Sequence, residues 1–487
     1  MKILIAASEA VPYAKTGGLA DVAGALVKEY RGMNKEAYII LPLYRSIKKG
    51  AASLQYSGLT IKVPVGERTI EARLFHDKSS SYFLECDEFF YREELYGTPR
   101  GDFADNASRF TFFSRGVLET CKRLKFQPDV IHCNDWQTGL VPLYLKTLYK
   151  IDPFFKGTAS LLTIHNLGYQ GLFPAAEMPL TGLGRELFNP EGIEFYGKMN
   201  FLKAGLISAD VLTTVSNTYA KEILQKDFAF GLEGVLKLRE NDLFGVINGI
   251  DYDEWDPSRD MLIPEKFSSG VLHGKAGCKK RLIKEALLDK VDRPLIGLVG
   301  RLSTQKGLDL VLQSLEELLS LGVNLILLGK GDELFQIGLS EAARKYKGRV
   351  SVTIGFDESL AHKIYAGSDF FLIPSKYEPC GLGQLISMRY GSIPIGRKTG
   401  GIADTIEDYN PLSSRGTGFL FSDFTPSAMI NAVKRALCLY TDGGKIKKVV
   451  IAGMKMDFSW KRSAERYIRL YAGAIKKKRG KVYLNVA

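Results

Sequence analysis

The chain has 487 residues, of which 45% are hydrophobic and 25% charged, and its formal net charge is +12. At roughly 100–200 residues per domain this length predicts two or three domains, and the average composition excludes global disorder, a fibrous repeat and a small disulfide-stabilised scaffold. Because the excess of basic residues is diffuse, we expect anionic small molecules as partners rather than nucleic acid.

The chain opens with a short apolar run, residues 2–7, which predicts a buried strand and is too short for a signal peptide. No run approaches the roughly 18 consecutive apolar residues of a membrane-spanning helix. The six cysteines lack the paired spacing of zinc or redox sites, so we expect reduced thiols. These features predict a soluble, cytoplasmic protein with no membrane partner.

Short apolar runs rich in β-branched residues alternate with helical patterns along the chain. Runs that are apolar on both faces belong to parallel sheets covered by helices, so the predicted class is α/β, with two Rossmann-like doubly wound domains. We predict strands within residues 2–7, 37–41, 130–132, 159–164, 211–215, 295–299, 324–328, 370–373 and 393–396.

A domain boundary is expected near residues 248–251, because no clear strand follows until Leu295. We therefore predict an N-terminal domain over residues 1–245 and a C-terminal domain over residues 246–458. An amphipathic helix, residues 459–476, could pack on either domain. The basic tail, residues 477–487, is interpreted as a frayed, solvated end rather than a nucleic-acid-binding arm.

One motif occurs twice, as Lys-Thr-Gly-Gly-Leu-Ala-Asp at residues 15–21 and as Lys-Thr-Gly-Gly-Ile-Ala-Asp at residues 398–404. Each copy follows a predicted strand and precedes a helical pattern, at the strand end where open α/β sheets bind ligands. Paired glycines permit close approach of the backbone, so such a turn can hold phosphate or sugar hydroxyls. The alternative is a tight turn with structural glycines, which the presence of two copies makes the weaker interpretation.

The loop at residues 300–307 presents Arg301 and Lys306 between a strand and a helix. An arginine fork and a lysine point charge together suit a diphosphate whose negative charge grows as it departs. The alternative, two exposed surface cations, fits the position between strand and helix less well.

Another loop at a strand end, residues 375–384, places Glu378 before a proline and a glycine turn. This carboxylate could accept hydrogen bonds from sugar hydroxyls or stabilise positive charge. In isolation, a Glu-Pro pair more often marks the start of a helix.

Two loops of the first domain complete the candidate site: residues 134–136, with Asp135 beside Trp136, and residues 165–171, which begin with His165. A carboxylate beside an indole ring is a common carbohydrate subsite. For Trp136 alone, core packing is the favoured interpretation, and His165 could equally be a core histidine.

Several chemistries are disfavoured because their motifs are missing. The sequence contains no Walker A motif, no Gly-x-Gly-x-x-Gly after the first strand, no Gly-x-Ser-x-Gly elbow and no ligand cluster with metal spacing. We therefore expect neither ATP hydrolysis, hydride transfer nor serine hydrolysis, and no metal or other cofactor.

Taken together, these motifs resemble the bacterial glycogen synthase and plant starch synthase family. The similarity rests on the two Lys-Thr-Gly-Gly copies, Arg301, Lys306 and Glu-Pro-Cys-Gly-Leu at residues 378–382. It also includes Asn-Asp-Trp at 134–136, His-Asn-Leu-Gly-Tyr-Gln-Gly at 165–171, Asn-Phe-Leu-Lys-Ala-Gly at 200–205 and Asn-Gly-Ile-Asp at 248–251. These motifs follow in order over nearly the whole chain.

This resemblance implies a GT-B glycosyltransferase whose two domains face a central cleft and close over the donor, with the last helix crossing back onto the first domain. It implies metal-independent transfer of glucose from ADP-glucose to the non-reducing end of an α-1,4-glucan such as glycogen, with retention of configuration. The oligomeric state stays open.

By the same resemblance, the cations of residues 300–307 neutralise the leaving diphosphate and the residues of the glycine motifs enclose the donor and acceptor. Phe356 falls where the family places an aromatic ring against the adenine, and His165 and Asp135 lie beside the anomeric carbon. The family pattern assigns catalysis to Arg301, Lys306, Glu378, His165 and Asp135, and substrate binding to Lys15, Gly17, Gly18, Asp21, Asn248, Phe356, Cys380, Gly381, Leu382, Thr399 and Gly400.

The residues themselves favour a front-face mechanism, because no convincing pair of carboxylates supplies the nucleophile that double displacement requires. Two alternatives stay open. One is a catalytically silent paralogue that binds glucan or nucleotide sugar, and the other is a GT-B transferase that uses UDP-glucose.

Overall fold

The computed structural model describes residues 1–50, 53–98 and 100–480. The chain divides into two compact units. The first comprises residues 1–215, residues 220–246 and a C-terminal stretch that begins at Trp460, and the second comprises residues 216–219 and 247–459. No helix within the described ranges is both long enough and apolar enough to cross a bilayer.

The first unit is built on a nine-stranded sheet in the order β14-β13-β9-β8-β1-β2-β5-β4-β3. Its strands from β14 to β5 are parallel, and β1, β2, β8, β9 and β13 confirm predicted strands. Strands β5 and β14 were not predicted, nor was the antiparallel extension formed by β4 and β3. The strands of this sheet are β1 (Lys2–Ala6), β2 (Glu36–Pro42), β3 (Gln55–Val65), β4 (Arg68–His76), β5 (Ser81–Glu85), β8 (Val130–Asn134), β9 (Ala159–Ile164), β13 (Val211–Thr214) and β14 (Leu243–Gly245).

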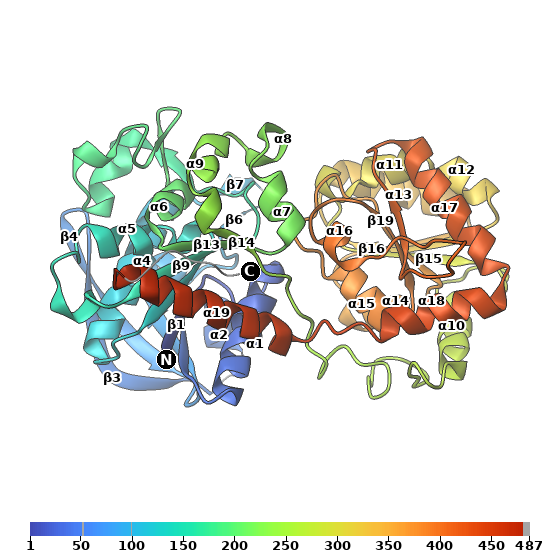
Figure 1. The fold of residues 1–487 in the computed structure, drawn as a ribbon, viewed down its shortest axis with the longest axis horizontal. Coiled ribbons are helices and arrows are strands. Elements are labelled where there is room, and N and C mark those ends of the chain that lie inside the picture. Colours follow the sequence, from blue (N-terminus) through green and yellow to red (C-terminus); the bar gives the residue numbers. More distant parts are fainter. Residues whose placement is uncertain (51–52, 99, 481–487) are drawn as a thin grey trace. The chain divides into compact units, whose positions relative to one another are not determined.

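Helices cover both faces of this sheet. On one face α1 and α19 pack side by side, and on the other α4, α5 and α6 pack together (Figure 1). The helices of this unit include α1 (Gly18–Gly32), α2 (Arg45–Lys49), α3 (Asp87–Phe90), α4 (Asn106–Arg123), α5 (Leu140–Lys146), α6 (Phe201–Ser208), α8 (Lys226–Ala229), α9 (Glu233–Leu238) and α19 (Trp460–Lys478), with α7 (Asn217–Glu222) at the junction of the two units.

A buried polar network anchors α19 to the first sheet. The hydroxyl of Tyr471 lies 2.6 Å from His132 Nδ1 and 2.9 Å from the hydroxyl of Tyr30, and His132 Nε2 lies 2.6 Å from Thr163 Oγ1. Burial lowers the pKa of His132 to about 3, so this ring is neutral and serves as a hydrogen-bonding link.

The basic end of the chain differs from the expected frayed tail. Helix α19 continues to Lys478, and Lys477 Nζ donates to the backbone carbonyl of Asp210 at 3.1 Å. Arg479 lies 3.4 Å from the carboxylate of Asp129. Residues 481–487 of the predicted tail lie outside the described residues.

The second unit is built on a parallel sheet in the order β17-β16-β15-β18-β19-β20. Alternate residues of its strands enter two separate hydrophobic clusters, one on each face, which explains why the strands read as continuous apolar runs. Its strands are β15 (Leu295–Val299), β16 (Asn324–Gly329), β17 (Val350–Ile354), β18 (Phe370–Ile373), β19 (Ile393–Arg397) and β20 (Phe419–Phe421), and its helices are α10 (His273–Glu285), α11 (Leu308–Gln313), α12 (Leu315–Ser320), α13 (Glu333–Lys345), α14 (Glu358–Gly367), α15 (Gly383–Arg389), α16 (Gly400–Thr405), α17 (Pro426–Tyr440) and α18 (Gly443–Met454).

Each parallel sheet has a point where the strand order reverses. In the first unit the chain runs from β1 to β2 on one side and from β8 to β9 on the other, so the reversal lies between β1 and β8. In the second unit it lies between β15 and β18. Open α/β sheets bind ligands beyond the carboxyl ends of the strands at such points.

Candidate active site

Many of the predicted site residues of each unit lie beyond the carboxyl ends of strands at or next to its reversal point, whereas Phe356 follows the edge strand β17. In the first unit Lys15 follows β1, Asp135 follows β8 and His165 follows β9, and these three strands are neighbours in the sheet. In the second unit the loop with Arg301 and Lys306 follows β15, and the loop with Glu378 follows the adjacent β18. Each unit therefore carries one group of candidate loops, and each group is called the half-site of its unit.

The glycine loop of the first half-site is held by a buried carboxylate that the sequence interpretation did not select. Glu9 accepts hydrogen bonds from the backbone N–H and the hydroxyl of Thr16, the latter at 2.7 Å, and from the hydroxyl of Tyr96 at 2.6 Å. The N–H of Gly17 also donates to Glu9, at 3.3 Å. The sequence indicates this role of Glu9 only through its position shortly after the first predicted strand.

Lys15 of this loop pairs with Asp21, which lies in the first turn of α1. Lys15 Nζ lies 2.7 Å from Asp21 Oδ1, and the lysine side chain is 45% exposed. Gly17 precedes the first turn of α1, which begins at Gly18. The loop thus presents a cation and the start of a helix at the carboxyl end of β1.

Asp135 occupies a strained position after β8. Its backbone has φ 53° and ψ −169°, which is uncommon for a residue with a side chain and costs of order 1–3 kcal/mol. Its Oδ1 accepts a hydrogen bond from the N–H of His165 at 2.7 Å. Burial raises the pKa of Asp135 to about 7, although the hydrogen bond from His165 opposes this shift.

The ring of His165 has a defined tautomer. His165 Nε2 lies 2.8 Å from Asn134 Oδ1, and Asn134 Nδ2 donates to the carbonyl of Ala6 at 3.1 Å. Because the amide nitrogen of Asn134 is a donor, its oxygen is the acceptor, and the histidine proton resides on Nε2. Burial lowers the pKa of His165 to about 3, so the ring is neutral and Nδ1 carries the lone pair.

Trp136, beside Asp135, belongs to the core. It is 7% exposed, its ring centroid lies 4.7 Å from that of Phe110, and it also packs on Phe173. A Cβ on Gly171 would lie 2.4 Å from the indole ring, so the glycine lets this loop approach the tryptophan. The favoured interpretation of core packing is therefore confirmed.

The second half-site is dominated by charge. Lys306 Nζ lies 2.6 Å from Glu378 Oε2, and the same oxygen accepts a hydrogen bond from the hydroxyl of Ser375 at 2.8 Å. The glutamate side chain is 7% exposed and the lysine 25%. This pair fixes both side chains at the reversal point of the sheet.

Arg301 lies exposed in the same loop as Lys306. One of its terminal nitrogens donates to Gln305 Oε1 at 3.3 Å, and Gln305 Nε2 lies 3.4 Å from the carbonyl of Tyr377. The guanidinium and the ammonium therefore extend from one loop that is tied to the loop containing Glu378.

The second glycine motif packs tightly against the loop of residues 378–382. Gly400 has φ 44°, and a Cβ there would lie 1.9 Å from the carbonyl oxygen of Glu378. The N–H of Gly401 donates to that same carbonyl at 3.1 Å. Thr399 is buried at the start of α16, and Gly381, with φ 74°, and Leu382 complete the turn before α15.

Three further candidates differ in exposure. Cys380 is buried, and burial raises the pKa of its thiol to about 12, so it stays protonated at neutral pH. Asn248 is buried too, and its Oδ1 has no hydrogen-bond partner among the described residues. Phe356, in contrast, follows β17 and is 89% exposed, so its ring does not belong to the core.

Models of two protein families match the chain. The "Starch synthase catalytic domain" model matches residues 2–238, and the "Glycosyl transferases group 1" model matches residues 279–444. The two matched segments contain every candidate residue except Asn248.

Individual proteins match over almost their full length. The chain is 48% identical to a glycogen synthase of Syntrophotalea carbinolica, over 98% of this chain and 99% of that protein. It is 45% identical to a glycogen synthase of Thermodesulfovibrio yellowstonii, over 98% of each. The solved catalytic domain of starch synthase IV from Arabidopsis thaliana, bound to ADP and acarbose, superposes with a TM-score of 0.90 at 32% identity and covers 98% of this chain and 99% of that one.

Proposed function

Because the chain belongs to the glycogen and starch synthase family of GT-B glycosyltransferases, we propose that it transfers glucose from ADP-glucose to the non-reducing end of an α-1,4-glucan with retention of configuration. The nucleotide is inferred from the relative of A. thaliana, whose solved structure contains ADP, and the glucan from the same structure, which contains acarbose.

The observation that carries this proposal is the placement of Arg301 and Lys306 at the reversal point of the second sheet. When the bond to the sugar breaks, negative charge grows on the diphosphate, and preorganised cations stabilise that charge in the transition state. Glu378 holds Lys306 in position through the contact of 2.6 Å. We assign Arg301 and Lys306 to the leaving group and Glu378 to positioning of the lysine and binding of sugar hydroxyls.

Retention without a covalent intermediate is supported by the state of the carboxyl groups of Glu378 and Asp135. Double displacement requires a free carboxylate as nucleophile. Glu378 accepts hydrogen bonds from Lys306 and Ser375, and Asp135 accepts one from the N–H of His165. Since both are engaged, we favour a front-face route in which the departing phosphate receives the proton of the acceptor hydroxyl.

The first half-site is suited to sugar hydroxyls. The lone pair on Nδ1 of neutral His165 can accept a hydrogen bond from a hydroxyl without adding charge. The remaining substrate contacts are proposed for Lys15, Gly17, Gly18, Asp21, Asn248, Phe356, Cys380, Gly381, Leu382, Thr399 and Gly400.

A silent paralogue is the second candidate function, and it would be favoured by loss of the charged residues of the half-sites. Lys15, Arg301, Lys306 and Glu378 are all present. We therefore favour active glucose transfer over a silent paralogue.

The test is incorporation of labelled glucose into glycogen from ADP-glucose and, in parallel, from UDP-glucose, with no metal added. We expect incorporation from ADP-glucose, at a higher kcat/KM than from UDP-glucose. Preference for UDP-glucose would refute the proposed donor, and binding of both donors without incorporation would favour the silent paralogue. Polarimetry or NMR of the new linkage tests retention.

A further inference from the structure

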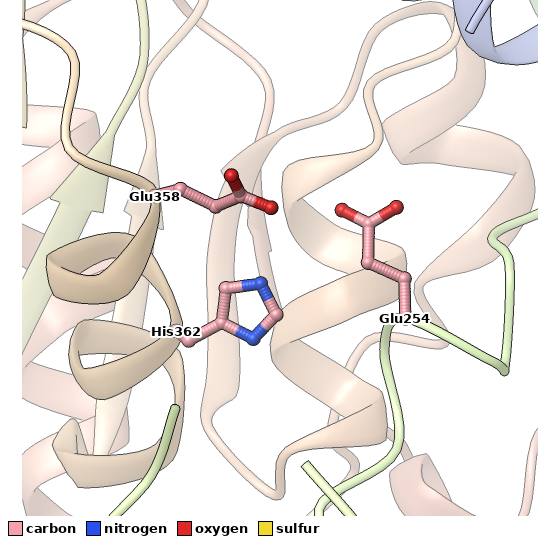
Figure 2. Close-up of side chains that lie close together, drawn as sticks. All are labelled: Glu254, Glu358 and His362. Atoms are coloured by element: carbon pink, nitrogen blue, oxygen red, sulfur yellow. The ribbon is translucent and has the colours of Figure 1, made fainter. Parts of the chain in front are cut away.

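A group of three side chains that could bind a metal lies in the second unit, outside the residues assigned to transfer. Glu254, Glu358 and His362 each place one ligand atom within 4.8 Å of the other two (Figure 2). Glu358 and His362 lie four residues apart at the start of α14 and therefore share one face of that helix. Glu254 comes from the loop that follows the boundary between the units.

The ring of His362 is fixed by contacts on two sides. Its Nδ1 lies 2.8 Å from Asp260 Oδ2, an oxygen that also accepts a hydrogen bond from the hydroxyl of Tyr390 at 2.6 Å. Asp260 thus acts as the acceptor, and Nδ1 carries the proton. Trp255 stacks on the ring, with centroids 4.0 Å apart and an interplanar angle of 13°.

The other ring nitrogen lacks a partner. His362 is 1% exposed, and its Nε2 has no hydrogen-bond partner among the described residues. Figure 2 shows Nε2 directed toward the carboxylates of Glu358 and Glu254. A buried ring nitrogen without a hydrogen-bond partner is unfavourable, and so is a pair of carboxylates at close range. One bound cation would satisfy both.

The arrangement around His362 matches a common feature of metal sites. A histidine that ligates a metal usually donates its other N–H to a carboxylate, which fixes the ring and makes it a stronger ligand. Asp260 occupies that position here. The sequence alone shows only that Glu358 and His362 are four residues apart, because Asp260 and Glu254 lie about a hundred residues before them.

We propose that Glu254, Glu358 and His362 bind one divalent transition-metal ion, with Zn²⁺ as the preferred ion and water completing its coordination. One imidazole and two carboxylates suit Zn²⁺ better than Mg²⁺ or Ca²⁺, which prefer oxygen ligands alone. Ligands about 2.0–2.2 Å from a tetrahedral ion lie roughly 3.3–3.6 Å apart. The two glutamates are exposed, so the rotation of their side chains that would bring the ligand atoms closer involves no repacking of the core.

The ion would be structural and takes no part in the proposed transfer. It would join the segment after Asn248 to the segment that contains Phe356, since Glu254 and Glu358 follow those residues closely. This consequence for the donor side rests on the proposed function, whereas the site itself does not.

The test is calorimetric titration of ZnCl₂ into the tag-free, chelator-treated full chain, followed by titration of CoCl₂ with the visible spectrum of Co²⁺ as readout. Test variants are Glu254→Gln and Glu358→Gln. The matched control is Glu333→Gln, because Glu333 is also an exposed glutamate at the first position of a helix, α13. Circular dichroism checks that all three variants are folded.

We expect one Zn²⁺ per chain, a Kd weakened at least ~10-fold by each test variant and unchanged by Glu333→Gln, and Co²⁺ bands that disappear in the test variants. An affinity unchanged in either test variant would overturn the site, because the ion would then bind elsewhere, for example at the exposed Cys438 or His273. Absence of stoichiometric binding at micromolar Zn²⁺ would overturn it too. Because none of these readouts uses glucose transfer, failure of the proposed function leaves the result interpretable.

Discussion

The two copies of the Lys-Thr-Gly-Gly motif have almost the same sequence but different structural roles. In the first copy no described atom lies within 4 Å of a Cβ built on Gly17, whose φ is −156°. In the second copy a Cβ on Gly400, with φ 44°, would lie 1.9 Å from the carbonyl oxygen of Glu378. The first glycine keeps space open beside the helix start, whereas the second brings a helix against a neighbouring loop.

The aspartates that close the two copies also differ. Asp21 pairs with Lys15 of its own motif at 2.7 Å. Asp404 instead accepts hydrogen bonds from the N–H of Asn217 at 2.6 Å and from the hydroxyl of Thr218 at 2.5 Å. The repeated motif therefore indicates a repeated strand-to-helix turn, and it does not indicate a repeated function.

The loops next to the two copies also differ, in the charge of their side chains. Beside the first copy, burial favours the neutral forms of Asp135 and His165. Beside the second copy, Lys306 and Glu378 form an ion pair and Arg301 is exposed. The neutral side chains of Asp135 and His165 suit hydroxyl groups, whereas the charged side chains of Arg301 and Lys306 suit a diphosphate. The comparison therefore predicts that substitutions at these positions have different effects in the two units.

The largest effect is expected from removing a cation of the second half-site. Lys306→Ala and Arg301→Ala should each lower kcat/KM by ~10²–10³-fold, because each removes about 3–4 kcal/mol of stabilisation from the transition state. Steady-state kinetics with the donor varied measures this loss. Lys434→Ala, which removes an exposed lysine paired with Glu317 on the same unit, is the matched control. Near-normal kcat in either test variant would refute the leaving-group assignment.

The next largest effect is expected at Gly400, which packs against the loop that contains Glu378. Gly400→Ala should lower the free energy of unfolding by about 3 kcal/mol, because the new Cβ is placed against the carbonyl of Glu378 at a positive φ. Chemical denaturation measures the change. Gly443→Ala is the control, since no described atom lies within 4 Å of a Cβ at that helix start. Equal stability of the two variants would contradict the packing role.

A third prediction uses the pKa of Asp135, which is about 7 in the folded protein and roughly 3.9 in the unfolded chain. Between these values the folded state binds more protons, so stability falls as the pH rises from about 4 to about 7. Asp135→Asn lacks this dependence. Its stability relative to the unsubstituted chain should rise by roughly 2–3 kcal/mol from pH 5 to pH 7, as measured by denaturation at both pH values. A constant difference would mean that Asp135 is ionised throughout.

The smallest effect on stability is expected at the first glycine. Gly17→Ala should change the free energy of unfolding by less than ~1 kcal/mol, because the site is open and φ is in the extended region. If the open space holds substrate, kcat/KM should nevertheless fall. Paired denaturation and kinetic measurements test both parts, and a large loss of stability would remove the contrast with Gly400.

The strands and the order of the site loops could be predicted because buried parallel strands read as apolar runs, and ligand loops follow their carboxyl ends. What could not be predicted depends on contacts between distant residues. Glu9 reaches Tyr96 across 87 positions, and His362 reaches Asp260 across 102. The different roles of Gly17 and Gly400 were hidden too, because an identical motif does not reveal what packs against it.

The return of α19 to the first unit has a consequence for synthesis. The ribosome emits the strands of the first unit early, yet Tyr471, the partner of buried His132 and Tyr30, emerges only after residues 247–459 of the second unit. During translation, one face of β8 and β9 therefore lacks its cover until α19 has been synthesised. The buried polar groups of this face, His132 and Thr163 among them, therefore lack Tyr471 throughout the synthesis of the second unit, and we expect a chain that stops before Trp460 to leave them exposed to water.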